Sequence, residues 1–292
     1  MNTVHPGQKT GWVRAAGGTA ARVLSVALGL FVLALAPVQA QHLVRTHSHV
    51  YAFDPEGEID LTTYKGSIAV APWDHPKVQI DVRIVAEDYD GVLMLEDIVI
   101  RIEGSEQSLT IETDYRKALQ GIYKLFDYST SPRLPPVHYV IRMPRTARLK
   151  IDDYMSVTTI TDFQADLDFY TYKGAVTLTH FGGTLRLDTF MGKAEVALSP
   201  LVRDCRIESH EGEVAVSLPD GLGVDLDVDL GTSQAVFAYE ASLAGLDGGA
   251  KGSHALLRKK MTYQTSINGG GARLSLATHS GSLRLSYLGN GN

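Results

Sequence analysis

Hydrophobic and polar residues alternate along residues 149–225, and the alternation recurs in four similar segments. The segments are LKIDDYMSVTTITDFQAD, LDFYTYKGAVTLTHFGGT, LRLDTFMGKAEVALSPLVRD and CRIESHEGEVAVSLPDGLGVD, with lengths of 18, 18, 20 and 21 residues. A period of two predicts β-strands rather than helices. A repeat of about 20 residues is typical of stacked repeats, in which each turn is buried by its neighbours.

Apolar residues recur at equivalent positions of the four segments, counted from the first residue of each. Position 1 holds Leu149, Leu167, Leu185 and Cys205. Position 3 holds Ile151, Phe169, Leu187 and Ile207, and position 12 holds Ile160, Leu178, Val196 and Val216. Position 8 holds Ser156, Gly174, Gly192 and Gly212, where a small residue allows a positive φ or a tight corner. We expect positions 1, 3 and 12 to form the core.

These columns predict an all-β chain, and specifically a parallel β-solenoid or β-helix-like repeat domain with like side chains about 4.8 Å apart. An antiparallel β-sandwich is the alternative, because short, closely spaced strands suit that fold as well. Ile59–Val70 and Leu274–Leu285 fit the same repeat. We therefore expect one β-repeat domain over residues 41–292, with strands throughout residues 42–113.

Residues 114–137 interrupt the strand pattern. Their apolar residues recur at helical spacing, at Leu119, Ile122, Tyr123 and Phe126. Prolines then end any helix. The pattern predicts a short amphipathic helix and a proline-rich return, which we interpret as a cap over an open end of the repeats. A partner-binding surface and a membrane contact are the alternatives.

Residues 1–40 read as a signal peptide. Val23–Ala36 is an apolar stretch of 14 residues, which is short for a membrane span, and Val38-Gln39-Ala40 offers a cleavage site before Gln41. An uncleaved anchor is the alternative. Cleavage would remove three of the 27 basic residues and change the net charge from −6 to −9. The sequence thus predicts an exported, acidic protein of the periplasm, the outer surface or the medium, with no membrane span in the mature chain and no nucleic-acid partner.

Several of these features together resemble the bacterial "putative adhesin" family, whose domain has no known function. The matching parts are the export signal and, in order, GSIAV at 66–70, VHYVIRMPRTARLKI at 137–151, the glycine-marked repeats, and INGGGARLSLATHSGSLRL at 267–285. The chain departs from the family at Ser156, at Ser233 and in residues 114–137. The resemblance covers residues 50–286 and implies a β-repeat fold at the cell envelope. It implies no catalytic residues.

Charged side chains alternate with the core columns and are expected to face outward. Position 4 carries Asp152, Asp188, Glu208 and Asp229, and position 2 carries Lys150, Arg186 and Arg206. A ladder of carboxylates could serve glycoside cleavage, which needs two of them about 5–9 Å apart, or could hold Ca²⁺. The simpler interpretation is a solvated face that contacts a ligand.

Other candidate groups point less clearly to chemistry. His47 and His49 share one face of a strand and could bind a metal with His42, although no Cys, and no Asp or Glu before Asp54, completes a ligand set locally. The aromatic residues of position 6, Tyr154, Tyr172 and Phe190, could stack on sugars or on each other, and we favour mutual stacking. Cys205 is the only cysteine and is interpreted as a small core residue. The glycine runs lack the spacing of phosphate-binding loops.

The sequence therefore predicts a non-catalytic exported protein, without a cofactor, that binds or scaffolds at the cell envelope. The expected partner is an envelope protein or polysaccharide. The competing hypothesis is an envelope carbohydrate-active enzyme that uses carboxylates on the outer face. A cleft with converging carboxylates would favour the enzyme, and a flat ladder would favour the binding protein.

Overall fold

The computed structural model describes residues 43–125, 133–237, 255–258 and 261–288, all of them within the unit Gln41–Asn292. The expected signal peptide and its cleavage site lie outside the described residues, as does Phe126. No helix in the described part of the chain is long and apolar enough to cross a membrane.

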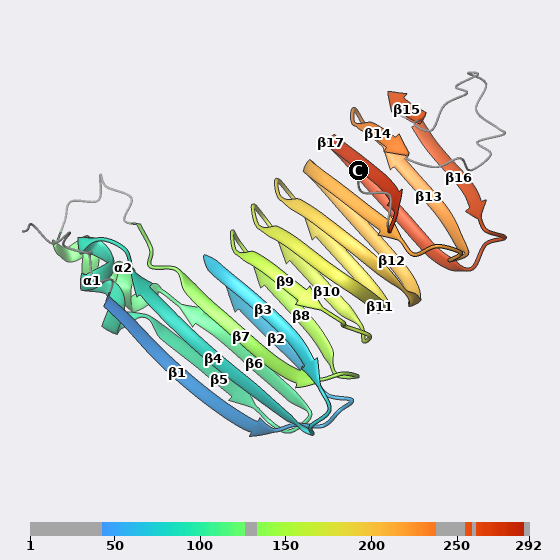
Figure 1. The fold of residues 1–292 in the computed structure, drawn as a ribbon. Helices are drawn as coiled ribbons and strands as arrows, with labels where there is room; N and C mark the ends of the chain where they lie inside the picture. Colours follow the sequence, from blue (N-terminus) through green and yellow to red (C-terminus); the bar gives the residue numbers. More distant parts are fainter. Residues whose placement is uncertain (1–42, 126–132, 238–254, 259–260, 289–292) are drawn as a thin grey trace, which may run out of the picture. The chain divides into compact units, whose positions relative to one another are not determined.

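Strands make up most of this unit (Figure 1). The first strands are β1 (Leu43–Ala52), β2 (Glu58–Thr63), β3 (Gly66–Trp73), β4 (Lys77–Ala86), β5 (Val99–Gly104), β6 (Ser108–Asp114) and β7 (Val137–Pro144). The repeats contain β8 (Arg148–Asp153), β9 (Val157–Thr161), β10 (Leu167–Thr171), β11 (Ala175–Thr189), β12 (Lys193–Leu218), β13 (Val224–Leu230) and β14 (Gln234–Phe237). The last strands are β15 (Ala255–Arg258), β16 (Met261–Ile267) and β17 (Ala272–Tyr287). The helices are α1 (Tyr89–Met94), the 3-10 helix η1 (Leu95–Asp97) and α2 (Arg116–Leu125).

Equivalent positions of successive repeats lie opposite each other in parallel strands. Leu167 of β10 is paired with Leu149 of β8 on one side and with Leu185 of β11 on the other. Leu185 is in turn paired with Cys205 of β12. The predicted alignment of position 1 is confirmed, and the register explains why the columns are apolar: each side chain packs on its counterpart in the next repeat.

The order of the strands in space differs from their order in the sequence. Strand β2 pairs in parallel with both β6 and β8, so that Ile59 lies between Leu109 and Leu149. Strand β17 pairs in parallel with both β12 and β13, so that Leu274 lies between Cys205 and Leu226. In Figure 1 the blue β2 and β3 accordingly lie beside the yellow-green β8 and β9. The two stretches that fit the repeat in sequence are therefore strands of the same stack.

The sheet as a whole is mixed. Antiparallel pairs join β1 to β4, β4 to β7, β5 to β6, β13 to β16, and β14 to β15. The all-β prediction is confirmed, and the parallel arrangement holds for the pairs between repeats. The predicted core columns are buried: every residue named above at positions 1, 3 and 12 is at most 3% exposed.

The glycines of position 8 are needed for space rather than for a positive φ. Gly174, Gly192 and Gly212 are not among the residues with positive φ, whereas Gly66 and Gly281 have φ values of 139° and 145°. A Cβ atom on Gly192 would collide with the carbonyl oxygen of Gly174, and one on Gly212 with that of Gly192. The backbones of successive turns thus approach closely at this corner. Of the two alternatives expected for position 8, the tight corner therefore holds at these three glycines and the positive φ does not.

Two short helices depart from the expectation of strands throughout residues 42–113. Helix α1 begins after Asp88, whose carboxylate accepts a hydrogen bond from the Gly91 amide at 2.8 Å, and η1 follows α1 directly. Helix α2 was predicted, and it buries Ala118 and Ile122 against the core. Lys117 of α2 forms an ion pair of 2.6 Å with Asp97 of η1. The helices thus pack on each other, and the role of residues 114–137 as a cap stays a prediction.

Candidate functional site

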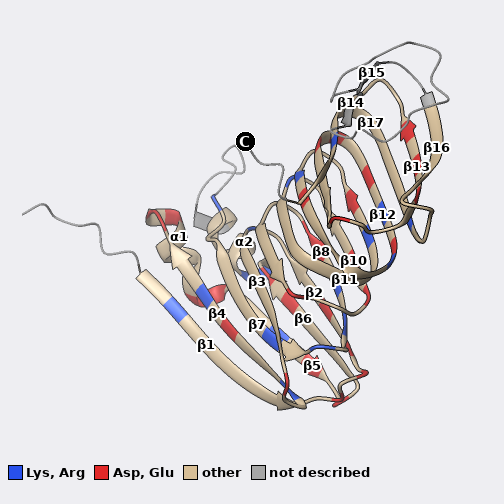
Figure 2. Cartoon of the chain, turned by 45° about the vertical axis from the view of Figure 1, so that its right-hand side comes forward, with Lys and Arg blue, Asp and Glu red and all other residues tan. Residues whose placement is uncertain are grey.

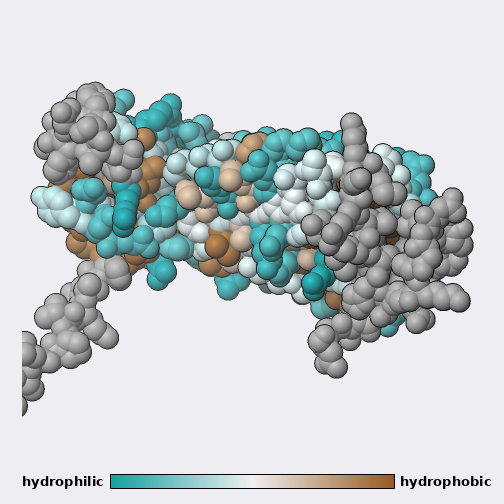
Figure 3. Space-filling view, turned by 90° about the horizontal axis from the view of Figure 1, so that it is seen from above, coloured by the Kyte–Doolittle hydropathy of each residue, from teal (hydrophilic) through white to brown (hydrophobic). Residues whose placement is uncertain are grey.

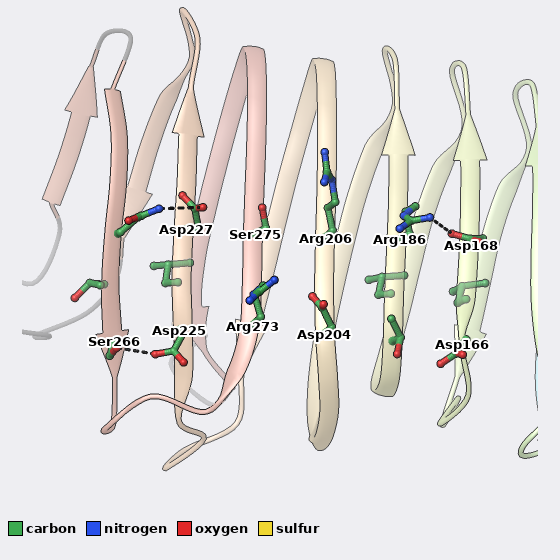
Figure 4. A pocket seen from close by; sticks show the side chains of 16 residues that line it. Asp166, Asp168, Arg186, Asp204, Arg206, Asp225, Asp227, Ser266, Arg273 and Ser275 are labelled. Carbon is green, nitrogen blue, oxygen red and sulfur yellow. Dashed lines mark hydrogen bonds and ion pairs between the residues drawn. The ribbon is translucent and has the colours of Figure 1, made fainter.

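A groove crosses the outer face of the strands β10, β11, β12, β17, β13 and β16, with a volume of about 890 Å³ (Figure 4). Its lining includes five aspartates, namely Asp166, Asp168, Asp204, Asp225 and Asp227. It also includes three arginines, Arg186, Arg206 and Arg273. Most of these residues stand at position 2 of a repeat or just before position 1, so their side chains point away from the core. Figure 2 shows acidic and basic residues on neighbouring strands in this region.

Several carboxylates of the groove are held by neighbouring strands. Asp168 forms an ion pair with Arg186 at 3.9 Å. Asp225 accepts a hydrogen bond of 2.6 Å from the Ser266 hydroxyl. These contacts join adjacent strands, and they fix the carboxylate oxygens at the level of the groove floor.

Two further aspartates of the groove also have polar side-chain partners. Asp166 pairs with Arg203 at 2.6 Å, and Asp227 accepts a hydrogen bond of 3.3 Å from the Gln264 amide. These four aspartates thus each have a polar partner of their own.

Arg273 occupies a central place in the groove. It lies in register between Asp204 of β12 and Asp225 of β13 (Figure 4). A row of charges of alternating sign thus crosses three neighbouring strands. Sequence reasoning missed Arg273 because the strand that carries it is far from β12 in the chain, although it did recognise that Leu274–Leu285 fits the repeat.

The predicted ligand-facing residues are divided between the groove and the surface beside it. Arg186 and Arg206 line the groove, and both are exposed. The other five predicted residues lie outside its lining, namely Lys150, Asp152, Asp188, Glu208 and Asp229. The groove is thus displaced from the position-4 ladder toward the beginning of the strands.

Two acids of the ladder are direct neighbours. Asp188 and Glu208 are paired in register across β11 and β12, and burial together with the negative charge of Glu208 raises the pKa of Asp188. Glu208 forms a close ion pair with Arg206. At the other end of the ladder, Lys150 donates a hydrogen bond of 2.7 Å to Asp60, which raises the pKa of the lysine.

The aromatic residues of position 6 stack on one another, as predicted. The centroids of neighbouring rings are 4.6–5.0 Å apart, in the order Tyr64, Tyr154, Tyr172, Phe190, His210 and His279. The ring of Tyr115 lies edge-on to the ring of Tyr64, with the two centroids 6.1 Å apart. Each stacked pair contributes about 0.5–1.5 kcal/mol beyond area burial, so the column stabilises the turns and leaves no ring face open between its members.

A second column, at position 5, was not recognised from the sequence. It consists of buried polar residues at the same corner, Thr63, Thr113, Asp153, Thr171, Thr189, Ser209 and Thr278. The hydroxyl oxygens of Thr171 and Thr189 accept hydrogen bonds from the amides of Gly174 and Gly192 at 2.9 and 3.0 Å. In these two turns the side chain thereby satisfies a backbone donor three residues later.

Asp153 is the one acid in this column, and it is 1% exposed. Its Oδ2 accepts hydrogen bonds from the Ser156 amide at 2.8 Å and from the Thr171 hydroxyl at 3.0 Å. Its Oδ1 is buried and has no hydrogen-bond partner among the described residues. Burial raises the pKa of Asp153, more than these hydrogen bonds lower it.

We expect the substitution Asp153→Asn to stabilise the protein, and to do so increasingly as the pH rises. The pKa of Asp153 is raised in the folded state. The contribution of its carboxyl group to stability is therefore fully present below the unfolded pKa of about 3.9, and it is lost as the pH rises through the pKa of the folded protein. Asparagine keeps an acceptor for Ser156 and Thr171 without the charge. Thermal unfolding from acidic to neutral pH should show a gain of about 1–3 kcal/mol at neutral pH and a small difference in acid. A gain that is independent of pH would contradict a charge effect.

Cys205 and the histidines show no reactive arrangement in the described chain. Cys205 is fully buried, and burial raises the pKa of its thiol, which confirms its interpretation as a core residue. His47 and His49 stack at 6.3 Å, and no group of three potential metal ligands occurs among the described residues. Ser67 shares a hydrogen bond of 2.8 Å with His138, whose pKa is lowered by burial and by Arg83. No carboxylate hydrogen-bonds to His138 in the described structure.

Solved structures that are similar to this chain include two bacterial proteins. One is described as a "putative cell adhesion protein" from Clostridium sporogenes, with 12% sequence identity, coverage of 84% of this chain and 100% of the other, and a TM-score of 0.43. The other is a "putative adhesin" from Bacteroides fragilis, with 11% identity, coverage of 84% and 97%, and a TM-score of 0.28. No protein-family model and no curated protein matches the chain.

Proposed function

We propose that this chain is a non-catalytic binding protein of the bacterial cell envelope, and that its groove holds an extended, polar ligand. The observation that carries the proposal is the row of aspartates and arginines that stand in register across neighbouring strands of the groove. The apolar stretch before Gln41 supports export, with the mature chain beginning at that residue.

The same proposal includes the finer description of the fold. We infer that the repeats form a parallel β-solenoid, capped at one end by residues 114–137. The in-register parallel pairs from β2 to β13 support the solenoid, and the packing of α2 against α1 and the core supports the cap. A solenoid presents equivalent side chains at the spacing of its strands, which is about 4.8 Å.

The chemistry of the groove favours an extended ligand with both donors and acceptors. Guanidinium groups bind carboxylates and hydroxyl oxygens, and aspartates accept hydrogen bonds from hydroxyl and amide groups. A polysaccharide or an extended peptide offers such groups at regular intervals. Because the contacts are exposed and polar, we expect binding to weaken as the salt concentration rises.

The proposal predicts that ligand binding depends on the three arginines of the groove. The triple substitution Arg186→Ala, Arg206→Ala and Arg273→Ala should weaken binding to immobilised envelope polysaccharide about tenfold or more, since each charge-assisted hydrogen bond contributes about 1.5–3 kcal/mol. The measurement is the dissociation constant, with whole cells as a second target.

A charge-matched control separates the groove from a general effect of positive charge. Arg133, Arg142 and Arg284 are exposed, the first just before β7, the second on β7 and the third on the second half of β17, and all three lie outside the groove lining. Their replacement by alanine should leave binding unchanged. Equal losses in the two triple variants would contradict a specific role of the groove.

A glycan-cleaving enzyme is the second candidate, favoured by one observation. Asp188 lies beside Glu208 and has a raised pKa, as a general acid requires. Against it, Glu208 is already held by Arg206, and neither acid lines the groove. Turnover of an envelope glycan that is abolished by Asp188→Asn alone would overturn the non-catalytic proposal.

A further inference from the structure

Strand β1 forms an uncovered edge of the sheet. Within the described residues it pairs with β4 and with no other strand, over all ten residues from Leu43 to Ala52. The backbone groups on its far side therefore face away from the sheet. Edge strands are usually protected from pairing by inward-pointing charges, prolines or bulges. β1 contains no proline, and its pairing with β4 is continuous. Its one arginine, Arg45, is held by Glu96 and by the carbonyl oxygen of Ile98.

On one face of this edge strand the exposed side chains are apolar or carry hydroxyl groups, whereas Arg45, His47 and His49 lie on the other face. On one face of β1, four exposed residues follow each other, namely Val44, Thr46, Ser48 and Val50. Val44 and Val50 are 43% and 57% exposed. Hydrophobic patches also appear at the end of the molecule where β1 and α1 lie (Figure 3).

The order valine, threonine, serine, valine is nearly palindromic and matches itself in an antiparallel arrangement. Two copies related by a two-fold axis through His47 place Val44 opposite Val50 of the second copy, and Thr46 opposite Ser48 of the second copy. Directly opposite residues of antiparallel strands point to the same face, so valine meets valine and hydroxyl meets hydroxyl. A two-fold axis makes such an edge self-complementary.

The charges of the neighbouring strand select this register over its alternatives. Thr46 lies next to Arg83 of β4, and Ser48 lies next to Asp81 and donates a hydrogen bond of 2.6 Å to it. With the axis at His47, the two rows that pass through Thr46 and Ser48 each have an arginine at one end and an aspartate at the other. An axis at Thr46 would give one row with arginine at both ends, and an axis at Ser48 would give one row with aspartate at both ends.

We propose that β1 is a homodimerisation edge, which pairs antiparallel with β1 of a second copy of this chain about a two-fold axis at His47. The pairing continues the sheet from one molecule into the next and satisfies the backbone groups of both edges. A second copy fits because, on the face that carries Val44 and Val50, its own edge presents the matching row of side chains and brings no like charges together. In the cell envelope such a dimer would present two grooves to one polymeric ligand, which raises avidity without a new contact.

The first experiment measures the oligomeric state of the full chain by analytical ultracentrifugation. We expect a concentration-dependent dimer. The double substitution Thr46→Lys with Ser48→Lys places lysine opposite lysine at two points and should raise the dissociation constant about tenfold or more. The control is Val157→Lys with Thr159→Lys, on the exposed face of β9, which is paired on both sides by β3 and β11. It should leave the dimer intact.

The second experiment tests the register by disulfide cross-linking. A Thr46→Cys chain mixed with a Ser48→Cys chain should cross-link under mild oxidation, whereas either chain alone should not. A monomeric wild-type protein, or a dimer that survives the Thr46→Lys and Ser48→Lys changes, would overturn the proposal. Cross-linking of the Thr46→Cys chain with itself would overturn the axis at His47.

Discussion

Replacing Leu185 with aspartate is expected to unfold the protein. Leu185 is 1% exposed and is paired in register with Leu167 and Cys205, so a carboxylate there would have apolar neighbours on both sides. An unpaired buried charge costs several kcal/mol, which is a large part of the about 5–15 kcal/mol that stabilises a typical domain. Circular dichroism during urea unfolding measures the loss.

The control for this substitution is the same chemical change at an exposed valine. Val157 lies in β9 and is 58% exposed, so Val157→Asp should change the free energy of unfolding by less than about 0.5 kcal/mol. Equal losses of stability at the two positions would show that the assignment of inner and outer faces is wrong.

Replacing Gly192 with alanine should destabilise the repeats, although the change adds a single methyl group. The new Cβ atom would collide with the carbonyl oxygen of Gly174, which accepts a hydrogen bond from the Lys193 amide at 3.2 Å. It would also clash with the hydroxyl oxygen of Thr189, which accepts a hydrogen bond from the Gly192 amide. Overpacking of this kind costs about 1–3 kcal/mol, and the rigid backbone at this corner places Gly192 toward the upper end. Urea unfolding monitored by circular dichroism checks the value.

A glycine in helix α2 gives the opposite expectation. A Cβ atom on Gly121 would meet only the carboxylate of Asp97, at an ordinary contact distance of 3.5 Å. Alanine also favours a helix over glycine by about 1 kcal/mol, so Gly121→Ala should stabilise the protein. If Gly121→Ala and Gly192→Ala both destabilise the protein, the loss of stability at Gly192 is not explained by the close approach of the backbones there.

The core and the aromatic column could be predicted because their pattern is local. Burial of alternate residues produces an alternating apolar pattern within one strand, as in Leu167 and Phe169. Stacking follows because aromatic residues occupy the same position in successive turns.

The short helix α1 has a weaker sequence signal. It has six residues, too few to show helical periodicity, and it contains Gly91. The N-cap Asp88 was its only clear signal.

The order of the strands and the full groove could not be predicted, because both depend on long-range pairing. Every turn has nearly the same pattern, so the sequence does not say which turn lies next to which. Arg273 therefore could not be placed beside Asp204 and Asp225. The polar column containing Asp153 was hidden for another reason: serine, threonine and aspartate are usually exposed, and their burial depends on hydrogen bonds that only the folded corner provides.

The position of β17 has a consequence for the time course of folding. This strand comes after β12 and β13 in the sequence, yet it lies between them. When the chain emerges from a ribosome or crosses a membrane, β13 appears before the strand that joins it to the earlier repeats. The C-terminal part of the stack therefore cannot grow by adding one turn after another, and its completion requires closure of the long loop from β12 to β17, a slow, non-local step. Once formed, β17 is held on both sides, so its amide hydrogens should exchange as slowly as those of the central repeats rather than fray like a chain terminus.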